Sequence, residues 1–214
     1  MSSASPSGRL RGMAGGDGGA PVRPEVVELR RYRLHPGRRD DLIALFDRAF
    51  VESQEDCGMA IMGQFRDLDD PDRFVWLRGF ADMATRDRGL RAFYGGPVWK
   101  ANRDAANATM VDASDALLLR PETPGGGLTH DPGRRPRPGA TPSEGRALFA
   151  LIQPRQDLPL DVDALAVYVT EHAENTFPAL PVRTDVDVRV TLTHTPAAAP
   201  EVLRLAPTPS SALR

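Results

Sequence analysis

Proline and glycine are distributed so unevenly along this chain that they decide where it can fold. Twelve of the 25 residues from 121 to 145 are proline or glycine. Neither a helix nor a strand propagates through such a stretch, because proline lacks a backbone N–H and glycine loses the most conformational freedom on folding. The sequence therefore predicts a linker at 121–145 between a folded unit at 25–120 and a smaller unit at 146–206.

The two ends of the chain are predicted to be tails. Residues 1–24 contain six glycines and no aromatic side chain, so they cannot bury enough apolar surface to offset the entropy of ordering. We expect this segment to be disordered, with Met13 as an alternative start to Met1. Residues 207–214 are expected to form a second tail.

The hydrophobic pattern of the first unit changes between a strand period and a helix period. Residues 39–53 place their apolar side chains on one helical stripe, and Pro97 suits the first turn of a later helix. In chain order the pattern predicts a strand at 26–34, a helix at 39–53, strands at 59–66 and 73–80, helices at 82–93 and 98–106, and strand segments at 109–112 and 116–120. This β-α-β-β-α-β order is typical of ferredoxin-like folds, which belong to the α+β class.

The second unit repeats the strands of the first unit without its helices. The expected strands span residues 147–153, 164–171, 186–194 and 201–206. Prolines at 154, 159, 196 and 200 exclude ordinary helices from the connections in which the first unit has them. A sheet without its own helices leaves one face uncovered, so we expect this mostly β unit to dock on the first unit or on another subunit.

Alternation along two strands of the first unit separates aliphatic side chains from polar and aromatic ones. On one face, Val75 and Leu77 suit packing under helices, whereas the other face mixes large aromatic rings with charges that a dry core does not tolerate unpaired. We therefore expect this second face to line a lumen on the concave side of the sheet. The candidate ligand-binding residues are Glu28, Arg30, Tyr32, Trp76 and Arg78, and the candidate interface residues are Phe74 and Phe80.

A structural interpretation of these residues is also open. Glu28 and Arg30 can form an ion pair that only supports the sheet, and Trp76 can anchor a subunit interface. A further group shares one helical face and either closes the mouth of the lumen or packs structurally. It consists of Trp99, Asn102, Arg103 and Asn107.

Composition excludes several classes of function. The chain has 27 basic and 29 acidic residues, and this balance gives no basic surface for a nucleic acid. A single cysteine excludes an internal disulfide framework and a cysteine-rich metal site. No apolar run approaches the roughly 20 residues of a membrane span.

No motif in the sequence implies a cofactor or a metal. The chain has no glycine-rich phosphate-binding motif and no nucleophile elbow. His172, between Glu171 and Glu174, is expected to be surface charge, and neither His172 nor His194 has the pattern that supports a haem ligand. Cys57 follows an acidic residue that raises the pKa of a thiol, so we do not expect it to be a nucleophile.

Several short motifs together resemble the NIPSNAP family of the dimeric α+β barrel superfamily. They are Glu28-Leu29-Arg30-x-Tyr32, Pro36-Gly37, Gly63-x-Phe65, the run from Phe74 to Phe80, Arg86-x-Arg88, Pro97-Val98-Trp99 and the segment from Asp115 to Pro121. Residues 175–183, NTFPALPVR, resemble a motif of bacterial members that carry a second repeat. The missing helices of the second unit depart from the family pattern.

The resemblance implies a barrel of two paired four-stranded sheets flanked by helices, formed in a homodimer or between tandem repeats of one chain. Eukaryotic members are associated with mitochondria and with vesicular trafficking or mitophagy signalling, and bacterial members mostly lack an established reaction. The wider superfamily includes cofactor-free monooxygenases and haem enzymes, so the fold alone does not select a chemistry.

We therefore expect a self-associating NIPSNAP-like protein of unestablished activity, with a small-molecule cavity and no cofactor. The alternative is a cofactor-independent monooxygenase or isomerase for a small aromatic or carbonyl compound. In that alternative Arg30 and Arg78 orient an oxyanion and Tyr32 relays a proton. A single lysine, Lys100, against 26 arginines is typical of a GC-rich bacterial source, and we expect the protein to be cytoplasmic.

Overall fold

A computed structural model describes residues 21–136 and 145–214 of the protein. Each predicted element of the first unit is present, with its ends within two residues of those expected. The elements are β1 (Val26–Leu34), α1 (Arg39–Leu45), η1 (Phe46–Phe50), α2 (Val51–Glu55), β2 (Ala60–Asp67), β3 (Arg73–Phe80), α3 (Met83–Gly95), α4 (Pro97–Asn107), β4 (Met110–Asp112) and β5 (Ala116–Pro121).

Local chemistry explains the helix boundaries. The side chain of Asp82 accepts a hydrogen bond from the backbone N–H of Thr85 at 2.6 Å and so caps α3, and Pro97 occupies the first turn of α4. The first helical region was predicted as one regular helix. It instead contains a π-helical turn, η1, between α1 and α2.

The second half is built from strands. They are β6 (Leu148–Pro154), β7 (Ala164–Thr170), β8 (Val188–Thr193) and β9 (Glu201–Pro207), and a short 3₁₀ turn, η2 (Pro132–Arg134), precedes them. In the described part of this half, from residue 145 onward, no helix is present. The prolines that excluded helices from the connections therefore had the expected effect.

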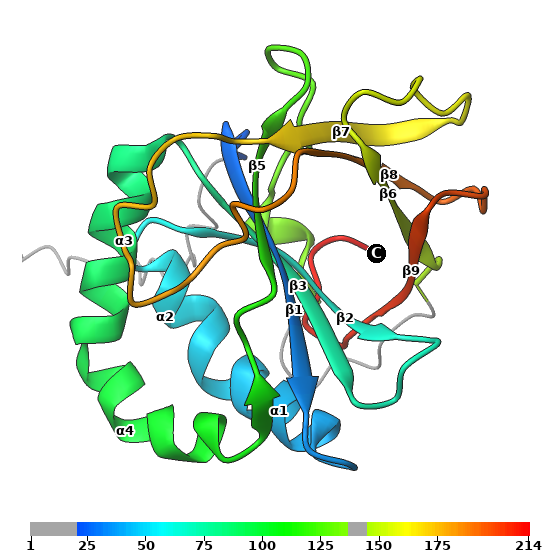
Figure 1. Ribbon diagram of the computed structural model, residues 1–214. Helices are drawn as coiled ribbons and strands as arrows, with labels where there is room; N and C mark the ends of the chain where they lie inside the picture. The colour runs from blue at the N-terminus through cyan, green and yellow to red at the C-terminus, as the bar shows by residue number, and fades with distance from the viewer. Residues whose placement is uncertain (1–20, 137–144) are drawn as a thin grey trace, which may run out of the picture.

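The strands close into an α+β barrel, as the ferredoxin-like pattern predicted (Figure 1). The first half has the strand order β5-β1-β3-β2, the second half has the equivalent order β9-β6-β8-β7, and short β4 adds to the outer part of β1. Two antiparallel seams, β2–β9 and β5–β7, join the halves within one chain. The expected docking of the second sheet therefore occurs edge to edge on the first.

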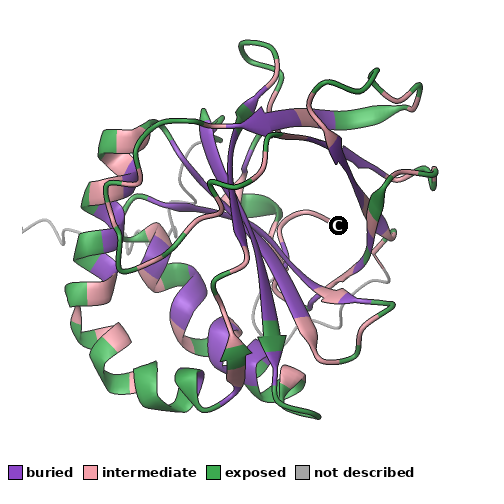
Figure 2. Ribbon diagram, viewed as in Figure 1, coloured by how far each residue is buried: buried purple, intermediate pink, exposed green. Residues whose placement is uncertain are grey.

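The barrel interior is mainly aliphatic, and this reverses the assignment of faces made from the sequence. Val75 and Leu77, expected under helices, point into the barrel and pack against second-half residues such as Leu192 and Leu203. Trp76, expected in a lumen, lies instead in the core between the helices and the outer face of the sheet. Alternation shows which side chains share a face, but both faces of this half-sheet are buried, so alternation could not say which one is inside (Figure 2).

The structure also changes the predicted ends of the folded part. The predicted first tail lies outside the described residues except for its last four, and among these Pro24 is buried and Val22 forms a β-bridge with His130. In the predicted second tail, the backbone N–H of Leu213 donates to the carbonyl of Met62, and the Leu213 side chain packs on the barrel interior. The C-terminus thus lies between the two half-sheets (Figure 1).

Candidate functional site

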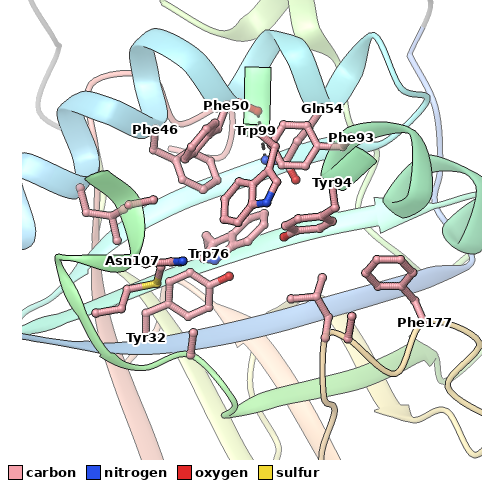
Figure 3. A pocket seen from close by; sticks show the side chains of 16 residues that line it. Tyr32, Phe46, Phe50, Gln54, Trp76, Phe93, Tyr94, Trp99, Asn107 and Phe177 are labelled. Atoms are coloured by element: carbon pink, nitrogen blue, oxygen red, sulfur yellow. Dashed lines mark hydrogen bonds between the residues drawn. The ribbon is translucent and has the colours of Figure 1, made fainter. Parts of the chain in front are cut away.

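The candidate site is a cavity of about 340 Å³ between the helices and the outer face of the barrel. Its floor is formed by Tyr32 and Trp76 of β1 and β3, and its other walls are mainly aromatic (Figure 3). The residues that line it are Tyr32, Leu42, Phe46, Phe50, Gln54, Trp76, Phe93, Tyr94, Trp99, Ala106, Asn107, Met110, Ala113, Phe177, Ala179 and Leu180. A volume of this size falls in the range of small-molecule sites.

The π-helical turn shapes one wall of this cavity. Phe46 and Phe50 are its first and last residues, and both side chains face the cavity with their rings 5.8 Å apart in an edge-to-face arrangement. Phe50 also packs edge to face on Phe93 of α3, at 5.7 Å. Because π-turns are rare and occur frequently at functional sites, this departure from a regular helix supports the cavity as a site.

A segment of the second half closes the other end of the cavity. We call residues 171–187, the connection from β7 to β8, the strap, and it crosses the helical layer beside α3 (Figure 1). Phe177 stacks on Tyr94 with a ring separation of 5.8 Å, and the Asn175 side chain accepts a hydrogen bond from Arg86 at 3.0 Å. Residues 175–183, which resemble a motif of two-repeat proteins, thus form one wall of a cavity in the first half of the chain.

A fully buried cluster of charges lies beside the cavity. Glu28 bonds three guanidinium groups: Arg30 at 2.9 Å, Arg78 at 2.7 Å and Arg86 at 2.7 Å. All four side chains have no exposed surface. Register explains part of this arrangement, because Glu28 lies directly opposite Arg78 in the β1–β3 pair.

Electrostatics keep this cluster ionised. Burial alone would raise the pKa of Glu28, but Arg78, Arg30 and Arg86 hold the pKa of that carboxyl far below its ordinary value. Burial opposes the charge on Arg78 as well, yet the pKa of Arg78 is raised because Glu28 is in contact with it. The contacts between Glu28 and the arginines therefore favour the charged form of the cluster.

Three polar residues connect this cluster to the cavity. The Nε atom of Arg30 donates to the Tyr32 hydroxyl at 3.1 Å, and a terminal nitrogen of Arg78 donates to the Gln54 side chain at 3.1 Å. Burial raises the pKa of the Tyr94 phenol, which keeps this hydroxyl protonated. In addition, the indole Nε1 of Trp76 is buried without a hydrogen-bond partner among the described residues.

The structure brings the five predicted ligand-binding residues together, but on the helical side of the sheet and not in a lumen. Phe74 and Phe80, which were predicted at a subunit interface, lie at 0% and 1% exposure in the core of this chain that also contains the helix residues. From the α4 group, Trp99 and Asn107 line the cavity, whereas the Asn102 side chain donates to the backbone of Val98.

Sequence reasoning missed most of the cavity wall, including Tyr94, and also the polar residues Arg86, Gln54 and Asn175. Arg86 shares a helical stripe with Leu90 and Phe93, and an arginine on an apolar stripe is a signal that could have identified it. Gln54 had no such signal, since its orientation depends on the π-turn. Asn175 acts across the two halves of the chain, and this contact follows from the path of the strap, which no local pattern encodes.

Over residues 21–136 and 145–214, no group of three or more histidine, cysteine and acidic side chains could hold a metal ion. Burial and then Asp56 raise the pKa of the Cys57 thiol, in the direction expected from the sequence. No helix in the described part of the chain is both long enough and apolar enough to span a membrane.

The first half of the chain is similar to one known protein family. Residues 27–123 match the model of the NIPSNAP family. Among solved structures, an uncharacterized NIPSNAP domain protein from Burkholderia xenovorans is 16% identical, with 46% of this chain and 95% of that one covered and a TM-score of 0.42. A NIPSNAP family protein from Agrobacterium tumefaciens is 18% identical, with 45% and 84% covered and a TM-score of 0.42.

A putative monooxygenase from Lactobacillus acidophilus aligns over both halves. It is 10% identical, covers 87% of this chain and 94% of its own, and has a TM-score of 0.48. No curated protein matches the sequence significantly.

Proposed function

Residues 27–123 of this chain are a NIPSNAP domain, and from that premise we propose that the protein binds a small, mainly apolar molecule in the cavity between its helices and its barrel. This domain has no reaction that its family membership alone would assign, so the proposal rests on the site itself.

The observation that carries the proposal is the combination of aromatic walls with a buried indole N–H that has no hydrogen-bond partner among the described residues. An indole N–H buried without a partner, such as that of Trp76, is costly in a folded protein unless something accepts its hydrogen bond. The Tyr32 and Tyr94 hydroxyls lie at the same end of the cavity (Figure 3). Apolar walls with a few fixed polar groups are what small-molecule sites generally present.

The chain has two tryptophans, Trp76 and Trp99, and both line the cavity, so intrinsic fluorescence reports on its occupancy. We expect a saturable change in tryptophan emission when phenylacetate or phenylacetamide is titrated into the protein. If neither compound produces a saturable change up to its solubility limit, the proposed function is wrong.

A filling variant and its matched control sharpen this test. Ala106 lines the cavity from α4 and is buried, whereas its neighbour Ala105 is exposed. Ala106→Phe is expected to remove binding by occupying the cavity, and Ala105→Phe is expected to leave binding unchanged. Equal binding by the two variants would place the ligand elsewhere.

A second candidate function is catalysis without a cofactor on a small aromatic or carbonyl compound. The contact from Arg30 to the Tyr32 hydroxyl favours it, because this hydrogen bond fixes the position of a hydroxyl on the cavity floor that can relay a proton. Oxygen uptake with an aromatic substrate, present in the wild type and lost in Tyr32→Phe, would support this function over simple binding.

The finer predictions on assembly and location belong to the same proposal. A homodimer would join two barrels, because both seams of the sheet form within one chain. Light scattering decides this, and a particle with the mass of one chain contradicts the homodimer. A cytoplasmic location and a bacterial source stay predictions from the sequence.

A further inference from the structure

The buried cluster beside the cavity carries more positive than negative charge. Three guanidinium groups, of Arg30, Arg78 and Arg86, share the single carboxylate of Glu28. Among the residues that the structure describes, no second carboxylate forms an ion pair with any of them. Uncompensated charge is unfavourable in a site without water, so an arrangement of this kind favours the arrival of an anion.

The other groups around the arginines do not supply the missing charge. Arg30 donates to the Tyr32 hydroxyl and to the carbonyl of Ala113, and Arg78 donates to the amide of Gln54. Arg86 donates to the amide of Asn175, and its second terminal nitrogen has no hydrogen-bond partner among the described residues. All these acceptors are neutral, and burial keeps the Tyr94 phenol protonated as well.

The excess charge is next to the cavity and not in a separate part of the core. Tyr32, Gln54 and Ala113 each line the cavity and each accept a hydrogen bond from the cluster. The guanidinium of Arg78 also lies 5.0 Å from the ring of Trp76, on the cavity floor. At this end of the cavity, a negative group of a ligand would be separated from Arg30 by Tyr32 and from Arg78 by Gln54.

We propose that the ligand of this cavity is a carboxylate with an apolar, aromatic body, whose charged end lies against Tyr32, Gln54 and Tyr94 next to the arginine cluster. The volume of about 340 Å³ corresponds to roughly eleven water molecules at about 30 Å³ each, so the body is about one aromatic ring with a short side chain. This inference rests on the proposed function, because it names the chemical class of the molecule bound there.

Phenylacetate and phenylacetamide test the inference, because they have the same shape and differ in charge. In the wild-type protein, monitored by tryptophan fluorescence, we expect phenylacetate to bind at least tenfold more tightly, which is about 1.4 kcal/mol. If phenylacetamide binds as tightly or more tightly, the inference is overturned while the proposed function stands. If neither compound binds, both are overturned.

Two buried arginines provide a matched pair of variants. Arg30→Gln removes one charge from the cluster and is expected to reduce the preference for the acid to less than threefold. Arg189, which is also buried, lies in the second half and is paired with Glu122, is the control, and Arg189→Gln is expected to keep the wild-type preference. A preference unchanged in a folded Arg30→Gln protein contradicts the inference, and if this variant does not fold, the wild-type ratio decides alone.

Discussion

At the scale of single residues, Glu28 is the group on which the buried charges depend. It is the carboxylate that all three buried arginines of the cluster contact. A buried charge that loses its partner keeps the cost of leaving water without the compensating attraction. The stability of the fold should therefore be far more sensitive to Glu28 than to any acidic residue at the surface.

Substituting Glu28→Gln is expected to destabilise the protein by about 3–5 kcal/mol, the usual effect of breaking a buried ion pair. Urea unfolding followed by circular dichroism measures this change. The control is Asp87→Asn, which removes the partner of Arg91 on the exposed side of α3 and should change the unfolding midpoint little. Similar midpoints for the two variants would contradict a structural role of the cluster.

The same carboxylate predicts how stability depends on pH. The pKa of Glu28 is lower in the folded protein than in the unfolded chain, so its contribution is complete above the unfolded value, roughly 4, and declines as the pH falls below it. We expect the wild type to lose stability on acidification below about pH 4 more steeply than Glu28→Gln does. Urea midpoints measured across this range test the slope, and parallel curves would show that Glu28 is not the titrating group.

At the scale of elements, the strap connects the second half of the chain to α3 of the first half. Asn175 is its central residue, because its side chain accepts from Arg86 and from the backbone of Phe177 and donates to the carbonyl of Leu180. The Asn175 side chain thus stabilises both the conformation of the strap and its contact with α3.

Asn175→Ala is expected to loosen the strap without unfolding the barrel. Backbone amides of residues 175–183 should exchange with deuterium at least tenfold faster, while those of β1 and β3 keep their protection. Hydrogen exchange with mass spectrometry measures both. Glu174→Gln, an exposed change in the neighbouring position, is the control, and equal exchange in the two variants would mean that Asn175 does not hold the strap.

Elements are also where the sequence was most informative. Glycine and proline between periodic segments predicted β1 and β3 to the residue, and Pro97 marked the first turn of α4. The π-turn at Phe46–Phe50 was not predictable, because the apolar stripe of 39–53 fits a regular helix equally well and only packing against the floor of the cavity distinguishes the two. Which side chains meet in the site depends on such tertiary contacts.

At the scale of the whole molecule, the two seams make one barrel of two half-sheets. The interior combines aliphatic residues of both halves, for example Leu29 and Leu77 from the first half with Ala150 and Ile152 from the second half. The sequence predicted that the second sheet needs a partner, either the first unit or another subunit. It could not predict which face of the first sheet turns inward, since Trp76 and Leu77 are both fully buried.

A chain that ends at residue 145 should not remain a monomer. It would expose the aliphatic inner face of the first half-sheet and the free edges of β2 and β5, which pair with β9 and β7 in the intact protein. Size-exclusion chromatography with light scattering is expected to show a dimer or larger species for this fragment. A stable monomeric fragment would mean that the first half does not depend on the second.

The closure of the barrel within one chain also has a consequence for how the protein could evolve. In a symmetric pair of identical subunits every substitution occurs twice, so each site exists in two copies that change together. Here a substitution in one half leaves the sequence of the other half unchanged, and the two halves differ in their elements. One half has the helices that enclose the cavity, while the described part of the other half, from residue 145 onward, has no helix and contributes Phe177 and Leu180 to the end of that same cavity. The two halves therefore contribute different parts of a single site.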